Sequence, residues 1–118
     1  MENGKMKIDV DTLVEYLHGR YADWANEQGL FMKLVEEVGE VAEILNMRAG
    51  RKTAADADLT HELGVELADI IHYVVAIAAI NSIDLSKIMI DKDRVAAVKY
   101  NHKINLEDFI KEKEAISK

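Results

Sequence analysis

The residues of this chain with the clearest capacity for chemistry are two clusters of carboxylates. One is EEVGE at residues 36–40, and the other is ELAD at residues 66–69. Side chains three positions apart on a helix are neighbours on one face. The clusters therefore contain two close pairs, Glu37 with Glu40 and Glu66 with Asp69. Like charges that close repel, and burying them is unfavourable unless a cation or protons neutralise them. Because hard divalent cations prefer oxygen ligands, these carboxylates are expected to bind Mg²⁺, with Mn²⁺ as an alternative.

The elements that must position these carboxylates are helices. The chain contains no proline, and no segment shows the sustained alternation of a strand. Apolar residues recur at helical spacing instead, and glycine, asparagine and aspartate mark the ends. The expected helices run from about Asp11 to Gln28 (with Gly29 as the stop), from Leu30 to Gly50, from a cap at Asp58 or Thr60 to Asn81, from the cap Asp84 to Tyr100, and from Leu106 to about Ile116 after the cap Asn105.

Both acidic clusters border apolar stripes that must pack inward. In the second helix the stripe consists of Phe31, Leu34, Val35, Val38, Val41, Ala42 and Leu45. In the third helix the residues Glu62, Glu66, Asp69 and Tyr73 fall within a sector of roughly 60° beside a second apolar stripe. A short connection favours antiparallel packing of the two helices. The four paired carboxylates are then expected to converge.

The stretch from Ile70 to Ile80 is apolar nearly all round, which is typical of a helix buried on every side. A subunit of this size can barely surround such a helix by itself. We therefore expect an all-α, four-helix-bundle-type subunit that completes its core by homo-oligomerisation, with a short C-terminal helix and a single domain over residues 1–118. The stretch 70–80 is too short to span a bilayer, so no membrane partner is expected.

The overall composition excludes several function classes. With 118 residues and a net charge of −7, the chain lacks the basic surface that binding to a nucleic-acid backbone requires. It contains no cysteine, so it has neither disulfides nor thiolate chemistry. Its first residues lack the hydrophobic core of a signal peptide. A cytoplasmic location is the expectation.

The acidic clusters also carry a resemblance to a known family. The run LVEEVGEVAE at residues 34–43, followed by ELAD at residues 66–69, resembles the E-E-x-x-E…E-x-x-D signature of the MazG-like all-α nucleoside triphosphate pyrophosphohydrolases. The resemblance extends from about His18 to Tyr100, and the segment near His18 is similar to the dCTP-preferring members.

This resemblance implies an activity and a role for each matching residue. Family enzymes cleave nucleoside triphosphates between the α and β phosphates, act as homodimers or homotetramers, and remove surplus or non-standard nucleotides. Glu36 would orient or deprotonate the attacking water, and Lys92 would be catalytic and contact phosphate. The implied metal ligands are Glu37 (also catalytic), Glu40, Glu66 and Asp69. The implied substrate-binding residues are His18, Tyr21, Trp24, Tyr73 and Lys92.

The chain departs from the family pattern after Lys92. Relatives often carry asparagine four residues later and arginine seven residues later, where this chain has Ala96 and Lys99. The phosphate or base contact of that asparagine would need another residue. Arg94, Lys99 and Asn101 are the candidates that the sequence offers.

Two other functions remain open from the sequence. Glu15 with His18, and Asp69 with His72, are carboxylate-x-x-histidine pairs, which di-iron and di-manganese helical bundles use. A non-enzymatic helical oligomerisation module is the second alternative, in which the acidic residues only keep the surface soluble.

Overall fold

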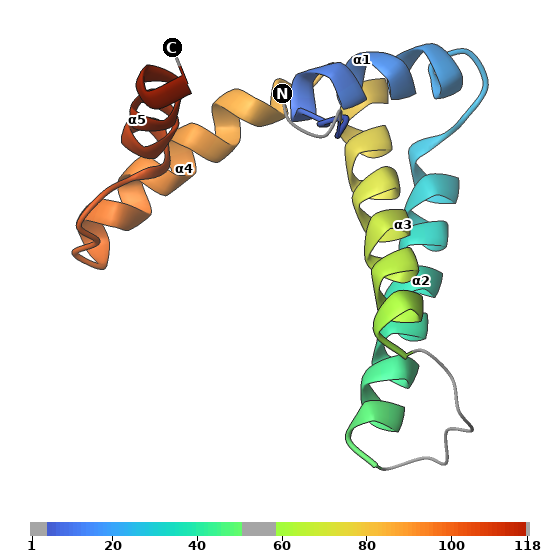
Figure 1. Ribbon diagram of the computed structural model, residues 1–118. Coiled ribbons are helices and arrows are strands. Elements are labelled where there is room, and N and C mark those ends of the chain that lie inside the picture. Colours follow the sequence, from blue (N-terminus) through green and yellow to red (C-terminus); the bar gives the residue numbers. More distant parts are fainter. Residues whose placement is uncertain (1–4, 51–58, 118) are drawn as a thin grey trace. The chain divides into compact units, whose positions relative to one another are not determined.

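The structure is a computed structural model that describes residues 5–50 and 59–117. Within these ranges the chain is all-helical, as predicted, and contains no strand. The five helices are α1 (Val10–Tyr21), α2 (Glu27–Arg48), α3 (Leu59–Ile80), α4 (Leu85–Lys99) and α5 (Leu106–Ser117) (Figure 1). They form two compact units, residues 1–83 and 84–118, each of which is described by itself. The single domain over residues 1–118 stays a prediction.

The break between α1 and α2 corrects the predicted helix boundary. The first helix ends at Tyr21, and Gly29 lies inside the first turn of α2. Asn26 caps α2, because its side-chain oxygen accepts a 2.7 Å hydrogen bond from the Gly29 amide. A Cβ atom at position 29 would lie 3.2 Å from that oxygen, so glycine here gives the cap room. The glycine therefore serves a helix start, not a helix stop.

α2 and α3 pack side by side in opposite directions (Figure 1). The pairing is visible at one end, where the Asn81 side-chain amide donates a 3.1 Å hydrogen bond to Glu27 at the start of α2. Residues at alternating spacings of four and three form the packed seam, which is the pattern of adjacent helices in a bundle. On α2 the seam residues are Leu30, Leu34, Glu37, Val41 and Ile44. On α3 they are Leu59, Leu63, Glu66, Ile70, Tyr73, Ile77 and Ile80.

This seam differs from the apolar stripe that the sequence predicted for α2. Leu34 and Val41 belong to both, but Phe31, Val35, Val38 and Leu45 of the predicted stripe are exposed. The stripe and the seam are shifted by one residue, so α2 carries two adjacent apolar edges. One edge faces α3, and the side chains of the other edge are exposed among the described residues of the first unit.

The core of the first unit lies around the C-terminal half of α3, against which α1 packs (Figure 1). Leu17 of α1 and Ala76 of α3 are fully buried there, and Val75 and Ala79 are nearly so. The stretch 70–80 is nevertheless not buried on every side within the chain, since Ile71 and Val74 are exposed. Burial of this stretch on every side would need a covering surface that the described chain does not supply.

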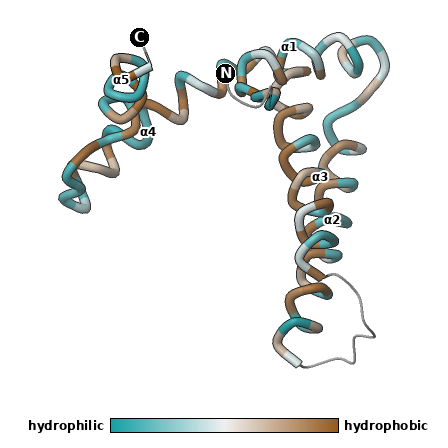
Figure 2. The backbone as a smooth tube through the Cα atoms, in the orientation of Figure 1, coloured by the Kyte–Doolittle hydropathy of each residue, from teal (hydrophilic) through white to brown (hydrophobic). Residues whose placement is uncertain are grey.

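Hydrophobic residues follow α3 along most of its length (Figure 2). The whole helix, with 22 residues, is long and apolar enough by length and composition to cross a membrane. The sequence argument considered only residues 70–80, which are half of this helix, and so it underestimated the length of the apolar segment. The core helix of a helical bundle meets the same criterion, and α3 packs against both α1 and α2.

The second unit consists of α4 and α5, whose caps are as the sequence predicted. The Asp84 side chain accepts a 3.1 Å hydrogen bond from the Lys87 amide, and Asn105 accepts one of 2.8 Å from the Asp108 amide. An ion pair joins the two helices, in which Arg94 of α4 lies 2.7 Å from Glu107 of α5.

Candidate metal centre and nucleotide pocket

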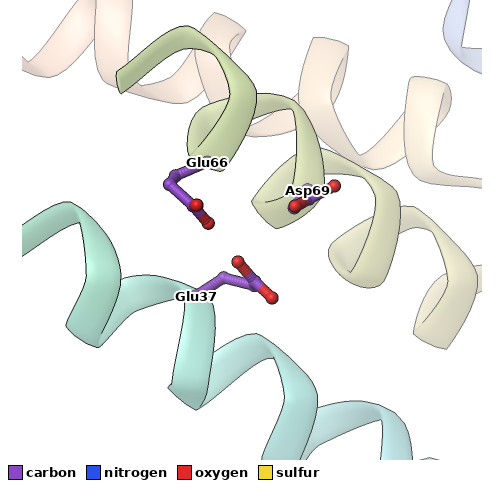
Figure 3. Close-up of side chains that lie close together, drawn as sticks. All are labelled: Glu37, Glu66 and Asp69. Atoms are coloured by element: carbon purple, nitrogen blue, oxygen red, sulfur yellow. The ribbon is translucent and has the colours of Figure 1, made fainter. Parts of the chain in front are cut away.

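Three carboxylates from α2 and α3 meet in the seam between these helices. One oxygen each of Glu37, Glu66 and Asp69 lies within 4.8 Å of the others (Figure 3). Glu37 and Glu66 occupy seam positions that apolar residues fill in the turns before and after them. The packing of the two helices therefore forces these like charges together. We call these three residues the acidic cluster.

The acidic cluster has no cation of its own within the described chain. None of its three carboxylates forms an ion pair with a described lysine or arginine. Oxygen Oε1 of Glu66 is shielded from solvent and accepts no hydrogen bond. An unsatisfied buried carboxylate oxygen is unfavourable, so the site lacks a positive partner.

The raised pKa of Glu66 also indicates that the acidic cluster lacks a positive charge. A hydrogen bond with Glu37, partial burial and the nearby negative charges raise the pKa of Glu66 from 4.5 to about 7. At neutral pH the cluster thus holds a proton for part of the time, because three ionised carboxylates so close repel strongly. A divalent cation would displace that proton and supply the missing charge.

The donor set fits a hard divalent cation. All three groups offer carboxylate oxygens, they come from two rigid helices, and the shielded Oε1 atom of Glu66 has no other partner. Mg²⁺ and Mn²⁺ accept such ligands and leave further positions to water or phosphate. The acidic cluster therefore has the composition of a metal centre that can hold a phosphorylated substrate.

The other two predicted carboxylates lie outside the acidic cluster. Glu40 is exposed and acts on Glu66 only through its charge. Glu36 is exposed and pairs with Lys33, whose ammonium lies 3.4 Å from Oε1 of Glu36. The structure thus brings together three of the four predicted metal ligands and places Glu36 at the edge of the site.

Beside the acidic cluster, an aromatic pocket of about 340 Å³ opens at the corner between α1 and α2. Tyr21, Trp24 and Tyr73, three of the predicted substrate-binding residues, line it together with Asn26 and Lys33. The rings of Tyr21 and Trp24 lie 5.5 Å apart. Such a pocket offers flat apolar surfaces and a few polar groups, which suits a nucleobase.

Tyr21 is held in place by His72. The hydroxyl of Tyr21 and Nε2 of His72 share a 2.7 Å hydrogen bond, and the tyrosine is only 7% exposed. Desolvation and, to a smaller extent, the positive charge of Arg20 lower the pKa of His72, so its ring is neutral at neutral pH. The histidine on α3 therefore fixes a wall of the pocket that comes from α1.

The same contact bears on the di-iron alternative. Among the described residues, the acidic cluster contains no histidine. Nε2 of His72 is engaged with Tyr21, and His18 is exposed on α1. Asp69 of one carboxylate-x-x-histidine pair thus belongs to the acidic cluster, but neither histidine joins it.

One of the remaining predicted substrate residues does not line the pocket, and the other belongs to the second unit, so that its contact with substrate stays a prediction. His18 is exposed and does not line it. Lys92 is exposed on α4, in the second unit. Sequence reasoning missed Lys33 and Asn26, although Lys33 precedes Glu37 by one helical turn and Asn26 has the residue type and position of a helix cap.

Comparison with known proteins extends these observations. The sequence model of the MazG nucleotide pyrophosphohydrolase domain matches residues 25–96, which include both halves of the acidic cluster. The crystal structure of iMazG from Vibrio DAT 722 superposes with a TM-score of 0.59 at 29% sequence identity. That match covers 80% of this chain and 100% of the iMazG chain. No protein with a curated description matches.

Proposed function

Since the chain belongs to the MazG nucleotide pyrophosphohydrolase family, we propose that it hydrolyses nucleoside triphosphates between the α and β phosphates, with Mg²⁺ as cofactor. The products would be a nucleoside monophosphate and pyrophosphate. The observation that carries this proposal is the acidic cluster, where three carboxylates converge without a cation of their own among the described residues. Removal of surplus or non-standard nucleotides is the corresponding physiological role.

The residues of the cluster would hold the ion in the seam between α2 and α3. Glu37, Glu66 and Asp69 are the proposed ligands, and Glu40 adds negative charge from the next turn of α2. When bound, Mg²⁺ neutralises phosphate charge and lowers the pKa of a coordinated water. Hydrolysis of a phosphoric anhydride depends mainly on such charge neutralisation and on positioning.

Glu36 is the proposed base for the attacking water. It is exposed at the edge of the cluster, where a carboxylate can accept a proton and release it to solvent. Its ion pair with Lys33 is long and exposed on both sides, so it restrains the carboxylate weakly. The aromatic pocket would receive the base, with Tyr21, Trp24 and Tyr73 as its walls.

The test is a panel of nucleoside triphosphates incubated with the protein and Mg²⁺, with products separated by chromatography. Monophosphate and pyrophosphate in equal amounts support the proposal. Diphosphate and orthophosphate, or no turnover of any triphosphate, contradict it. Omission of Mg²⁺ should stop turnover, and Mn²⁺ should restore it.

We also propose that the protein acts as a homo-oligomer. The uncovered edge of α2 carries Phe31, Val35, Val38 and Leu45, and α3 exposes Leu67, Ile71 and Val74. Exposed apolar faces of this kind are typical of protein interfaces. Sedimentation velocity should show a dimer or tetramer, and Val38→Glu with Ile71→Lys should shift it toward monomer. A wild-type protein that sediments as a monomer at all concentrations would contradict this proposal.

A further inference from the structure

Lys33 lies between the aromatic pocket and the acidic cluster. Among the described residues that line the pocket it is the cationic side chain, and Tyr21, Trp24 and Tyr73 surround the same space. Nothing in the sequence signature involves this lysine. Its place in the structure, however, links the two parts of the site.

The pocket and the cluster occupy successive turns of the same two helices. On α2, Lys33 precedes Glu37 by four residues, and on α3, Tyr73 follows Asp69 by four residues. Because α2 and α3 are antiparallel, both steps lead in the same direction. One helical turn rises about 5.4 Å. A nucleotide whose base lies in the aromatic pocket can therefore reach the acidic cluster with the phosphates on its sugar.

The charge of Lys33 suits a phosphate at that boundary. A hydrogen bond with Glu36 and the negative charges of Glu36 and Glu37 raise the pKa of the Lys33 ammonium, so it stays protonated at neutral pH. Its hold on Glu36 is weak, since the two groups are 3.4 Å apart and their side chains are 52% and 62% exposed. The ammonium is therefore free to turn toward a stronger anion.

We propose that Lys33 binds phosphate oxygens of the triphosphate substrate, at the junction between the base pocket and the acidic cluster. A triphosphate brings about four negative charges to a site that already holds three carboxylates, and one divalent ion compensates only part of that excess. Lys33 would neutralise phosphate oxygens on the pocket side. Its ammonium forms charge-assisted hydrogen bonds with phosphate, which are stronger than those between neutral groups. This inference rests on the proposed function and adds a substrate-contacting residue to it.

The test compares binding of charged and uncharged ligands in the presence of Mg²⁺. The probes are the α,β-methylene analogues of the deoxynucleoside triphosphates, measured by calorimetry, and the corresponding deoxynucleosides, measured by NMR titration. Lys33→Gln should weaken triphosphate binding by about 10- to 100-fold, the range for loss of a charged hydrogen bond. It should leave nucleoside binding unchanged. Lys33→Arg should retain most of the triphosphate affinity.

Arg48→Gln is the matched control, because it removes an exposed positive charge from the same helix, away from the pocket. It should change neither affinity. Circular dichroism and the fluorescence of Trp24 check folding, and Lys33→Met provides a second variant.

The outcomes separate this inference from the proposed function. Unchanged triphosphate binding by Lys33→Gln overturns the role of Lys33 and leaves the proposed function standing. Equal loss of nucleoside and triphosphate binding also overturns it, since Lys33 would then shape the pocket or contact the base. An equal loss in Arg48→Gln would point to general charge attraction and would likewise overturn it. A wild-type protein that binds none of the triphosphate analogues overturns both.

Discussion

The carboxylates of the first unit and those of the second unit differ in what neutralises them. In the second unit, Arg94 lies between Asp91 and Glu107, at 3.0 Å and 2.7 Å. Lys87 lies 2.7 Å from Asp91 and Lys111 lies 3.1 Å from Glu107. In the acidic cluster, carboxylates face one another and no described lysine or arginine pairs with them.

The pKa values move in opposite directions as a result. Hydrogen bonds from Lys87 and then Arg94 lower the pKa of Asp91, and Arg94 followed by Lys111 lowers that of Glu107. The pKa of Glu66 rises to about 7 instead. The same residue types thus stabilise a local structure in one unit and leave a demand for an external cation in the other. Carboxylates that repel are informative about function because packing alone does not favour them.

The largest expected difference between the two groups is in activity. Glu37→Gln removes a proposed ligand and should lower kcat/KM for the best triphosphate by at least about 100-fold. Glu107→Gln removes one partly exposed, ion-paired carboxylate of the second unit and should leave kcat/KM within about twofold. Steady-state kinetics with saturating Mg²⁺ measures both. Comparable losses in the two variants would show that the acidic cluster has no special role.

The next effect is on stability without metal. Glu66→Gln removes a charge that its neighbours repel, so it should raise the melting temperature of the metal-free protein at pH 8 by on the order of 3 °C. The variant should at the same time lose activity, because the amide is a poor metal ligand. Fluorescence of Trp24, which lies in the first unit, follows the transition. A lower melting temperature in Glu66→Gln than in wild type would mean that the repulsion among these carboxylates is outweighed by other contacts of Glu66.

The pH dependence should also separate the two units. The pKa of Glu66 in the folded chain lies above its ordinary value of 4.5, so its contribution to stability is complete below pH 4.5 and is lost as the pH rises through about 7. The lowered pKa values of Asp91 and Glu107 act oppositely, and their contribution is lost as the pH falls toward and below 4 (about the ordinary pKa of these groups).

Mg²⁺ makes this contrast measurable. The ion competes with the proton on Glu66, so saturating Mg²⁺ should raise the melting temperature more at pH 8 than at pH 6. Differential scanning fluorimetry at the two pH values measures the shift. In Glu66→Gln, Mg²⁺ should raise the melting temperature equally at the two pH values. If the rise still differs between pH 8 and pH 6, another titrating group causes the pH dependence.

The smallest expected effect is that of Arg94→Gln. The variant breaks two exposed ion pairs in the second unit, which should lower the melting temperature by no more than about 2 °C and leave kcat/KM within about twofold. Arg94 was one candidate to replace the family's asparagine, where this chain has Ala96. A loss of activity above tenfold would assign that role to Arg94.

The sequence was sufficient to predict the helices that carry the site and the meeting of their carboxylates. The spacing of Glu66 and Asp69 places them on one face of α3, and the antiparallel seam brings that face to Glu37. The part of the apolar face of α2 that packs on α3 was not predictable. Helical periodicity defines a broad apolar stripe but does not show which side of that stripe touches the neighbouring helix. For that reason Val38 was expected inside, and it is exposed.

Other features depend on contacts that sequence spacing does not specify. Gly29 has the residue type of a helix stop, and only the hydrogen bond from its amide to Asn26 shows that a helix begins there. Lys33 with Glu36 has the spacing of an ordinary solvated pair, and its position beside Tyr73 depends on the packing of α2 on α3. The contact between Tyr21 and His72 joins residues 51 positions apart.

Binding of Mn²⁺, followed by electron paramagnetic resonance at pH 8 without nucleotide, tests most directly whether the acidic cluster is a metal centre. We predict that wild type and Glu107→Gln remove the signal of free Mn²⁺ equally well, and that Glu37→Gln and Asp69→Asn bind at least about tenfold more weakly. Wild-type protein that leaves Mn²⁺ free in solution, or a Glu37→Gln variant that binds it as tightly as wild type, would contradict the account.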